Sequence, residues 1–331
     1  MDVSESIIYR HARVSVAPMM GYTDRHFRVL MRLLAPRSLI YTQMMKDEAV
    51  IRLQDRSVLF GEDRSLKGVV LQLGGASPER LALAVAIAEP YEYEAINLNV
   101  GCPSSKVQLA NMGACLFKQP KRVAQCVEAM RRATNRPITV KMRIGVDECD
   151  RFEDAVHFIQ TVHEAGCNDF IVHARKAWLK GLSPAQNRSI PKLDYHRVLA
   201  LKSHFPKINF VLNGGIVSYE QAMLWLGSFN QVMIGRQAPR QLQLIAQLAL
   251  GSSEPIECQP VLKKYFEYIE RNTDSNRFHH MLKHCVGVYQ GQPNASFWRK
   301  AVSNVMQNNN LSCLQDLLHL SGQMDQSIGA I

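Results

Sequence analysis

A cysteine next to a sharp break in the chain is the residue whose setting most directly predicts chemistry. Residues 97–100 alternate in polarity and are followed by Gly101, Cys102 and Pro103. Glycine ends the alternating run, and proline restricts the backbone just after the thiol. A loop at the end of a rigid strand can aim a reactive group. The alternative is a packing cysteine beside a tight turn, because free cysteine is among the most buried residue types.

Cysteine usage favours free thiols over a metal site or a disulfide framework. The chain of 331 residues contains 8 cysteines, and no two of them have Cys-x-x-Cys spacing. Scattered thiols are typical of a reducing compartment. The first five residues are acidic without an apolar core, and no apolar run approaches the length of a membrane span. We therefore expect a cytoplasmic protein without a bound metal or a membrane segment.

The net charge of +10, with a pI near 9.3, indicates a polyanionic partner such as nucleic acid, although many basic proteins bind none. The charge is unevenly distributed. Residues 255–331 contain 7 Lys/Arg and 6 Asp/Glu, so almost all of the surplus lies in the first 254 residues. If a polyanion binds, most of the electrostatic attraction is expected from that larger part. We infer no protein partner from the sequence.

Short β-branched stretches alternate with helical patterns and predict a parallel α/β architecture. Eight such units in about 240 residues fit a (β/α)8 TIM barrel. A doubly wound open sheet is the alternative, which is disfavoured because no Gly-x-Gly-x-x-Gly follows the first strand. The predicted strands, the first and third given with their exit loops, are residues 14–21, 38–42, 69–75, 95–99, 138–142, 170–173, 208–212 and 231–234.

The pattern changes after residue 250, where strand signals stop. We expect residues 1–250 to form the catalytic barrel and residues 251–331 to form a small all-helical domain. Within the barrel, Thr23 or Asp24 is expected to cap a helix, and residues 77–79 are expected to open another that has Pro78 in its first turn. The helices predicted after the linker are residues 261–270, 277–289, 296–306 and 311–320.

In a barrel of this kind the carboxyl ends of the strands form the active face. Unpaired polar groups there would be costly, so their repeated occurrence at equivalent places indicates a site. The residues that end the predicted strands are Pro18, Met19, Met20, Gln72, Asn99, Cys102, Lys141, Arg143, His173, Arg175, Asn213, Gly214, Gly215, Gly235 and Arg236.

The last two strands predict a phosphate site. Glycines at 214, 215 and 235 would let backbone N–H groups approach a phosphate, and Arg236 would add a charged donor. A phosphate-bearing cofactor follows, with Lys141 and His173 beside its ring, where a cation can stabilise a reduced flavin. The alternatives are that the glycines form ordinary turns, that Lys141 extends its ammonium to solvent along an apolar surface, and that His173 is a hydrogen-bonded residue of the core.

These motifs together resemble the tRNA-dihydrouridine synthases. The resemblance rests on the Asn-x-Gly-Cys-Pro motif and its companions, at residues 17–19, 97–103, 140–143, 173–175, 213–215 and 234–236. Residues 173–184 with Asn187 and Arg188, and later residues 280–291 and 298–299, are similar to the A-type bacterial branch. The resemblance covers nearly the whole chain, and the set is specific although each piece alone is weak.

The resemblance implies an FMN-bound barrel and a helical domain that clamp the D-loop and elbow of tRNA. It implies reduction of D-loop uridines, at tRNA positions 20 and 20a, with NADPH as the electron donor. Cys102 would be the proton donor, and Asn99 and Arg143 would hold the target base. FMN would contact Pro18, Met19, Met20, Gln72, Lys141, His173, Asn213, Gly214, Gly215, Gly235 and Arg236. Further tRNA contacts would be Arg175, Lys176, Asn187, Arg188, Arg299 and Lys300.

The expected reaction suits these residue types. Reduction of the uracil C5–C6 bond needs a hydride at C6 and a proton at C5. A thiol with a pKa near about 8.5 is mostly protonated at neutral pH and can act as a general acid. The base must leave the tRNA fold to reach a site at the barrel centre. Cys115, in an apolar setting, is interpreted as a packing cysteine.

Two other functions remain open at this point. A tRNA-binding protein that remodels the D-loop would have little use for Cys102. A flavin-dependent oxidoreductase acting on a small molecule, such as a dihydropyrimidine, would have little use for the basic surplus and the appended helices. Both features therefore favour the tRNA-modifying enzyme.

Overall fold

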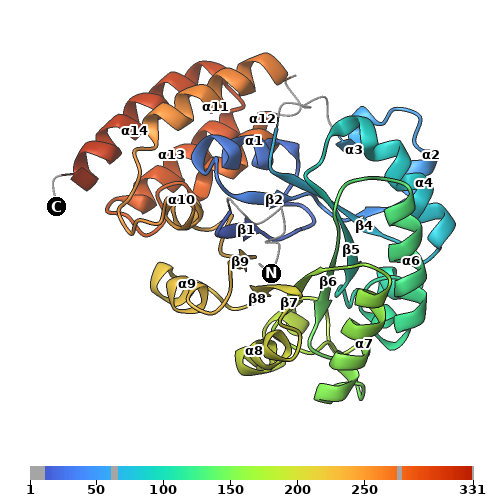
Figure 1. Ribbon diagram of the computed structural model, residues 1–331. Helices are drawn as coiled ribbons and strands as arrows, with labels where there is room; N and C mark the ends of the chain where they lie inside the picture. The colour runs from blue at the N-terminus through green and yellow to red at the C-terminus, as the bar shows by residue number, and fades with distance from the viewer. Residues whose placement is uncertain (1–11, 61–65, 274–277, 330–331) are drawn as a thin grey trace.

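Eight parallel strands form a closed barrel at the centre of the computed structural model, which describes residues 12–60, 66–273 and 278–329 (Figure 1). The strands are β1 (Val14–Val16), β2 (Leu39–Tyr41), β4 (Val69–Gly74), β5 (Ala95–Val100), β6 (Ile138–Arg143), β7 (Asp169–His173), β8 (Asn209–Asn213) and β9 (Gln231–Ile234). Strand β1 pairs with both β2 and β9, and β2 pairs with β4. The ring is therefore closed, which confirms the predicted TIM barrel and excludes the open sheet.

The alternation of side chains along each strand sorts residues between two cores. One face packs under the surrounding helices, as Leu98 and Val140 do, in a large apolar cluster. The other face points into the barrel, where a smaller apolar cluster includes Val70, Ala95 and Ile171. Residues two or four positions further along these strands share that inner face and are mostly polar, so polarity increases toward the carboxyl ends.

Two of the helices that surround the barrel begin where the sequence predicts. Asp24 caps the first helix by accepting from the backbone N–H of Phe27, and Ser77 caps another that begins at Pro78. The helices are α1 (Arg25–Leu34), α2 (Asp47–Arg52), α3 (Ser57–Phe60), α4 (Pro78–Ala88), α5 (Ser105–Gln108), α6 (Pro120–Arg132), α7 (Phe152–Glu164), α8 (Tyr195–His204), α9 (Tyr219–Leu226) and α10 (Leu242–Leu250). The two-residue strand β3 (Met45–Lys46) and helices α2, α3, α5 and α10 were not predicted. All of these except α10 are too short for a clear period.

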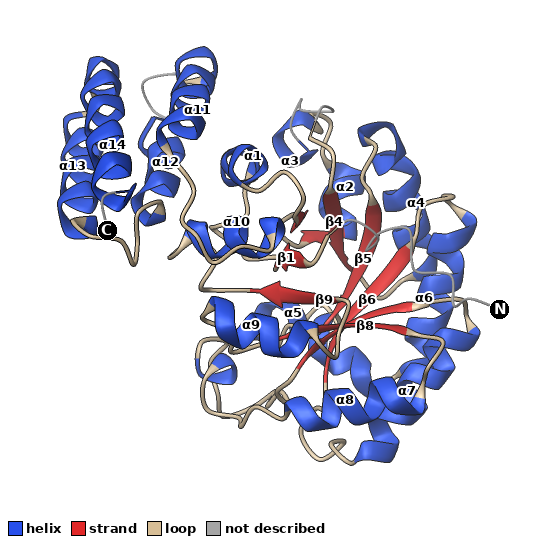
Figure 2. Ribbon diagram, turned by 60° about the vertical axis from the view of Figure 1, so that its left-hand side comes forward, coloured by secondary structure: helices blue, strands red, loops and turns tan. Residues whose placement is uncertain are grey.

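The chain after α10 has no strand within its described residues, and its helices lie to one side of the barrel (Figure 2). Its helices are α11 (Gln259–Asn272), α12 (Phe278–Leu282), α13 (Ala295–Asn308) and α14 (Leu314–Gly329). The predicted helix at 277–289 is α12 followed by the 3-10 turn η4 (Lys283–Gly287), and Arg277 lies outside the described residues. The predicted helix at 311–320 begins as the 3-10 turn η5 (Leu311–Cys313) and continues to Gly329.

The helical part packs on the barrel mainly through α1, which contacts α11 and η4 (Figure 2). Gln243 of α10 adds hydrogen bonds to the Ile256 carbonyl and to Sγ of Cys258, in the segment that leads into α11. The large apolar cluster continues from the barrel helices into α11 and α13 without a break. A division into two domains at residue 250 therefore stays a prediction, although the change of architecture is plain. Within the described ranges, no helix combines the length and apolar character that crossing a membrane requires.

Candidate active site

The carboxyl ends of the strands bring the predicted cofactor residues to one end of the barrel. Asn99 lies beside Lys141 in the pairing of β5 with β6, and His173 lies beside Asn213 in the pairing of β7 with β8. The ammonium of Lys141 donates to Oδ1 of Asn213 at 2.9 Å, across the intervening strand β7. Residues from four successive strands thus form one inward-facing layer.

The buried cations of this layer have depressed pKa values. Burial lowers the pKa of Lys141 to about 7, the Arg143 guanidinium lowers it further, and the Cys102 thiol opposes the shift. Burial, with Arg143 and Lys141, lowers the pKa of His173 well below its usual range, so His173 is neutral near pH 7. The pKa of Arg143 falls to about 10, mainly through burial, so Arg143 stays charged. The site is therefore desolvated, and near pH 7 it carries positive charge on Arg143 and on the protonated fraction of Lys141.

A flavin fits this environment by the chemistry of its residues. Among the described residues, no carboxylate contributes to the pKa of Lys141 or Arg143, so these cations lack an anionic partner in the chain. Buried cations without a counter-charge are costly, and an anionic or electron-rich ligand would offset that cost. A reduced flavin ring is such a ligand.

A chain of buried amides fixes the loop that carries the thiol. Oδ1 of Asn99 accepts the backbone N–H groups of Gly101 at 3.2 Å and Cys102 at 3.0 Å. Nδ2 of Asn99 donates to Oε1 of Gln72 at 2.9 Å, and Nε2 of Gln72 donates to Oδ1 of Asn97 at 2.7 Å. Nδ2 of Asn97 donates to the Thr139 hydroxyl at 2.8 Å. We call Asn99, Gln72, Asn97 and Thr139 the amide relay.

The amide relay includes two residues that sequence reasoning missed, Asn97 and Thr139. A signal for both was present, because each lies two positions before a predicted site residue and therefore on the same face of its strand. Asn99 and Gln72 were expected to contact ligands. The structure gives their side chains partners within the barrel, and their ligand contacts stay predictions.

The Cys102 thiol is half-buried at the barrel mouth, near Lys141 and Arg143. The chain after it folds back, with the Ala114 backbone N–H donating to the Cys102 carbonyl at 2.8 Å. A Cβ on Gly113, which has φ +74°, would lie 2.5 Å from that carbonyl oxygen. Glycine is therefore required where the chain crosses behind the cysteine.

Cys115 has a different environment. Its Sγ donates to the Met112 carbonyl at 3.1 Å, and burial raises its pKa. Its thiol is therefore occupied by a local contact, which agrees with the interpretation of a packing cysteine.

Arg143 joins two loops at the barrel mouth. Its guanidinium donates to the carbonyl oxygens of Gly101 at 3.1 Å, Lys176 at 3.1 Å and Asn187 at 2.8 Å. The side chain of Asn187 is buried and bonds to both the N–H and the carbonyl of Trp178, at 2.8 and 2.9 Å. Both residues thus organise the loop after β7, and their expected contacts with substrate stay predictions.

The residues predicted to contact tRNA differ in whether their charged groups already have partners within the protein. The Lys176 ammonium pairs with Asp150 at 2.5 Å and lies 3.9 Å from the centre of the Trp178 ring. In α13, Arg299 donates to Gln290 at 2.7 Å, while Lys300 is exposed. Arg188, in the 3-10 turn η3 (Gln186–Arg188), is exposed too. Lys176 therefore has protein partners that a phosphate would have to replace.

The turns after β8 and β9 form a positively charged edge of the site. Gly214 and Gly215 have φ values of +113° and +71°, which L side chains rarely adopt. Arg236 donates to the Arg188 carbonyl at 2.8 Å. Burial lowers the pKa of Arg236, and so do the neighbouring guanidinium groups of Arg188, Arg240 and Arg175. This cluster of arginines fits the predicted phosphate site, together with Gly235.

The loop after β1 supplies the last predicted cofactor residues, Pro18, Met19 and Met20. The N–H of Met19 donates to the Thr23 hydroxyl at 3.0 Å, and the Met19 carbonyl accepts from the N–H of Tyr22 and of Thr23. Met20 is 66% exposed. The loop is thus a compact turn at the barrel mouth with an exposed apolar side chain.

Comparison with known proteins identifies relatives along nearly the whole chain. Residues 15–321 match the model of the family described as dihydrouridine synthase. The tRNA-dihydrouridine(20/20a) synthase of Shewanella oneidensis is 42% identical over 87% of this chain and 87% of its own length. The proteins of that name from Synechocystis sp. and Escherichia coli K12 are 44% and 43% identical, over 88% and 89% of this chain and 88% and 87% of their own lengths.

A solved structure shares the fold at low sequence identity. The complex of 2-naphthoyl-CoA reductase with 2-naphthoyl-CoA superposes with a TM-score of 0.56 at 8% identity. The similarity covers 72% of this chain and 50% of the reductase. It supports the barrel fold of this chain.

Proposed function

The chain belongs to the dihydrouridine synthase family, and we propose that it reduces the C5–C6 double bond of D-loop uridines in tRNA, at positions 20 and 20a. The relatives that share about 42–44% of its sequence over most of both chains carry the name tRNA-dihydrouridine(20/20a) synthase. The observation that supports this best in the structure is the half-buried Cys102 thiol beside two buried cations without a counter-charge.

The family is flavin-dependent, and we propose FMN as the bound cofactor with NADPH as the electron donor. When bound, the flavin supplies the hydride that uracil C6 receives. Lys141 and Arg143 would favour negative charge on the ring, and neutral His173 could donate or accept a hydrogen bond there. Gly214, Gly215, Gly235 and Arg236 would hold the phosphate, and the loop of Pro18, Met19 and Met20 would contact the ring system.

Cys102 would give the proton to uracil C5. The amide relay holds the backbone of this residue through Asn99, and the Arg143 bond to the Gly101 carbonyl restrains the loop from the other side. A positioned acid needs this kind of restraint, because a proton is transferred only over hydrogen-bond distance. The thiol stays protonated at neutral pH in this proposal and is regenerated from solvent.

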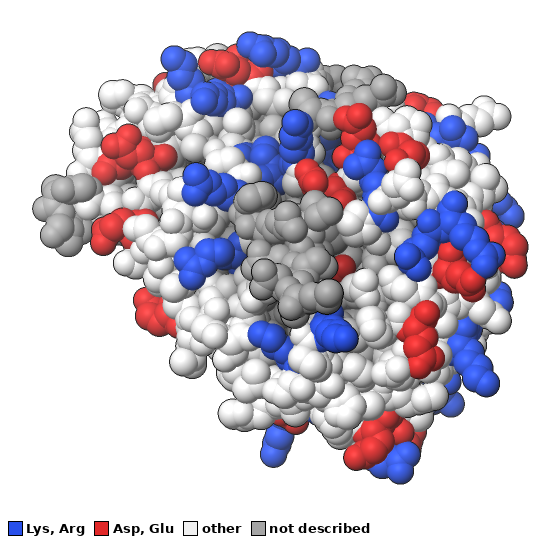
Figure 3. Space-filling view, viewed as in Figure 1, with Lys and Arg blue, Asp and Glu red and all other residues white. Residues whose placement is uncertain are grey.

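The RNA would be held across the barrel mouth and the helical part. We assign FMN binding and catalysis to residues 1–250 and tRNA binding to residues 251–331 together with the loop after β7. Basic and acidic side chains are interspersed on the face of the molecule shown in Figure 3, so that face has no continuous basic field. In the cluster at the β8 and β9 turns, Arg236 is assigned to the FMN phosphate, and Arg175 and Arg188 are the better candidates for contacts with RNA phosphates. The free state of all eight cysteines fits a cytoplasmic enzyme.

Mass mapping of tRNA from a strain that lacks this gene tests the proposal. Dihydrouridine at positions 20 and 20a should disappear and should return with the parent gene but not with Cys102→Ala. Return of the modification with Cys102→Ala at the parental level would support an RNA-remodelling role instead. Unchanged tRNA, with reduction of a free pyrimidine by the purified protein, would support the small-molecule oxidoreductase.

A further inference from the structure

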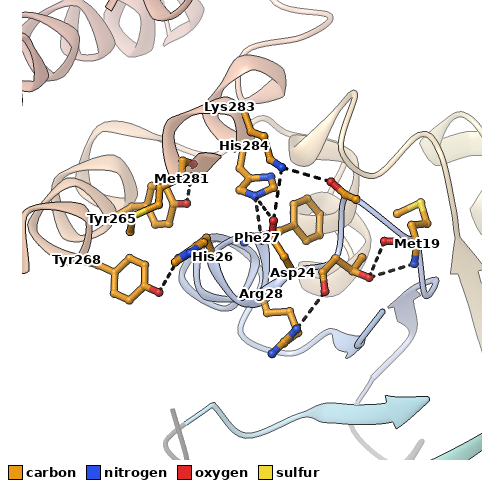
Figure 4. A network of polar contacts seen from close by, with 12 residues as sticks. Met19, Asp24, His26, Phe27, Arg28, Tyr265, Tyr268, Met281, Lys283 and His284 are labelled. Carbon is orange, nitrogen blue, oxygen red and sulfur yellow. Dashed lines mark hydrogen bonds and ion pairs between the residues drawn. The ribbon is translucent and has the colours of Figure 1, made fainter. Parts of the chain in front are cut away.

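The turn after β1 is fastened to the helical part of the chain by polar and charged side chains (Figure 4). Asp24, which caps α1 at the end of this turn, contacts Nε2 of His284 at 2.9 Å and the Lys283 ammonium at 3.6 Å. Lys283 also donates to the Gly21 carbonyl at 3.4 Å. These contacts span about 260 positions of sequence. We call Asp24, Lys283 and His284 the latch.

The latch is only partly exposed to solvent. His284 is buried, and its ring also packs edge-on against Phe27, with 5.5 Å between ring centres. The contacts with His284, Phe27 and Lys283 outweigh the opposing effect of burial and lower the pKa of Asp24 to about 2. Asp24 is therefore charged at neutral pH and binds both parts of the chain at once. The position of the turn is thereby coupled to the position of η4.

The turn that the latch holds presents an aromatic ring to solvent. Tyr22 is 52% exposed, and its side chain has no hydrogen bond or ring contact with any described residue. The backbone of the turn is ordered by the bonds between Met19 and Thr23, and Gly21 has φ +79°. An exposed ring on an ordered turn loses little conformational entropy when a planar ligand stacks on it.

We propose that Tyr22 is a nucleobase-stacking contact for the RNA substrate, held in place by the latch. Proteins that bind unpaired nucleotides stack the bases on aromatic side chains next to cationic groups. Tyr22 lies at the barrel mouth, where the target uridine would enter, and Lys283 adds a positive charge at the same turn. The base that stacks on Tyr22 would be a neighbour of the target uridine. The proposal rests on the proposed function, since it needs an RNA at this mouth.

The salt dependence of tRNA binding separates stacking from phosphate contact. Tyr22→Ala should weaken tRNA binding about 5- to 100-fold at every salt concentration. The slope of log affinity against log salt should not change, because no phosphate contact is lost. Tyr22→Phe should bind as the parent does, and Tyr22→Leu should resemble Tyr22→Ala. A reduced slope, or parental affinity in Tyr22→Ala, would overturn the proposal.

A double-mutant cycle tests the latch. His284→Leu removes the donor to Asp24, and His284→Gln restores one near the position of Nε2. His284→Leu should weaken tRNA binding several-fold in the parent but have no further effect in the Tyr22→Ala background, because both changes act through one turn. Tyr268→Phe, which removes the bond between Tyr268 and His26 in the same interface, should leave binding unchanged. Additive effects of the His284 and Tyr22 changes would contradict the latch.

Other ligands of Tyr22 are distinguished by the half-reactions. Flavin retention and reduction by NADPH should be parental in Tyr22→Ala, and a defect in either would assign the ring to the cofactor or to the nicotinamide, against the proposal. The parent protein must form dihydrouridine in the same assay. If the parent does not, the proposed function fails; if it does and Tyr22→Ala matches it, only the inference fails.

Discussion

Oδ1 of Asn99 accepts the backbone N–H of Cys102 at 3.0 Å, so a side chain near the carboxyl end of strand β5 holds the residue that carries the thiol. Because the same oxygen also accepts from Gly101, the amide of Asn99 has only one orientation that satisfies both donors. That orientation fixes the direction of every bond in the amide relay down to Thr139. The catalytic loop is therefore anchored in the interior of the barrel.

Cys102→Ala should leave the protein folded and yellow. Reduction of its flavin by NADPH should proceed at nearly the parental rate, because that half-reaction needs no proton at uracil C5. Transfer to tRNA should slow by about 10²–10⁴-fold, the usual contribution of a positioned acid. Stopped-flow absorbance of the two half-reactions separates them. Cys115→Ala is the control and should cost stability more than turnover; a defect that follows Cys115 would refute the assignment.

Thr139→Val should disrupt the amide relay without changing the shape of the barrel interior. The amide of Asn97, which is fully buried, would lose its acceptor at a cost of about 1–3 kcal/mol of unfolding free energy. We expect the tRNA half-reaction to slow by about tenfold, which corresponds to about 1.4 kcal/mol, with flavin reduction by NADPH unchanged. Thr139→Ser keeps the hydroxyl and should restore the rate. If the serine and valine variants have the same rate, the hydrogen bond between Asn97 and residue 139 does not contribute to the tRNA half-reaction.

Arg236→Ala should weaken FMN binding by about 1.5–3 kcal/mol, the scale of a hydrogen bond to a charged group. The reason is the position of Arg236 at the end of β9, among other guanidinium groups and beside the glycines of β8. Flavin released on dilution, followed by fluorescence, measures the change. Arg132→Ala, on the outside of α6 and paired with Glu128, is the matched control. Equal flavin occupancy in the Arg236 variant and the parent would exclude the phosphate assignment.

Affinity for tRNA should fall steeply with salt, because Lys and Arg that contact phosphates release counterions. Arg188→Ala should reduce the slope of log affinity against log salt by about 0.7–0.9, the value for one phosphate contact. Lys176→Ala should change the slope less, because its ammonium already pairs with Asp150. Titrations from low to physiological salt measure both. A flat profile for the parent would contradict binding through phosphates.

The stability of the flavin-free protein should depend on pH through Lys141. Its pKa is about 7 when folded, against 10.5 for the ordinary side chain, so between these values the unfolded chain binds more protons than the native one. Burial of the Lys141 ammonium therefore destabilises the fold fully below about pH 7, and this destabilisation disappears as the pH rises from about 7 to about 10.5. Lys141→Met should lack this rise in stability in urea titrations at pH 6.5 and 9. Parallel pH profiles for parent and variant would show that Lys141 is not desolvated.

The sequence alone determined the order and type of the main elements. Eight β-branched strands with helices between them, and the step to helices after residue 250, follow from local periodicity, and the structure has each of these strands. The same alternation placed Asn99, Lys141 and His173 on one face of their strands. Motif spacing around Cys102 then identified the family, because the chemistry requires those residue types close to the strand ends.

Only the tertiary structure decided which groups are partners. Arg143 meets carbonyl oxygens 33 to 44 positions away, Asn97 meets Thr139 at 42 positions, and the latch joins Asp24 to His284 at 260. These pairs depend on strand register and on the packing of α1 against η4, which no local pattern encodes. The pairing of Lys176 with Asp150 was missed for the same reason, and so was the role of Asp24 beyond its helix cap. A residue type restricts which bonds a side chain can form, and the fold selects among them by bringing one partner within reach.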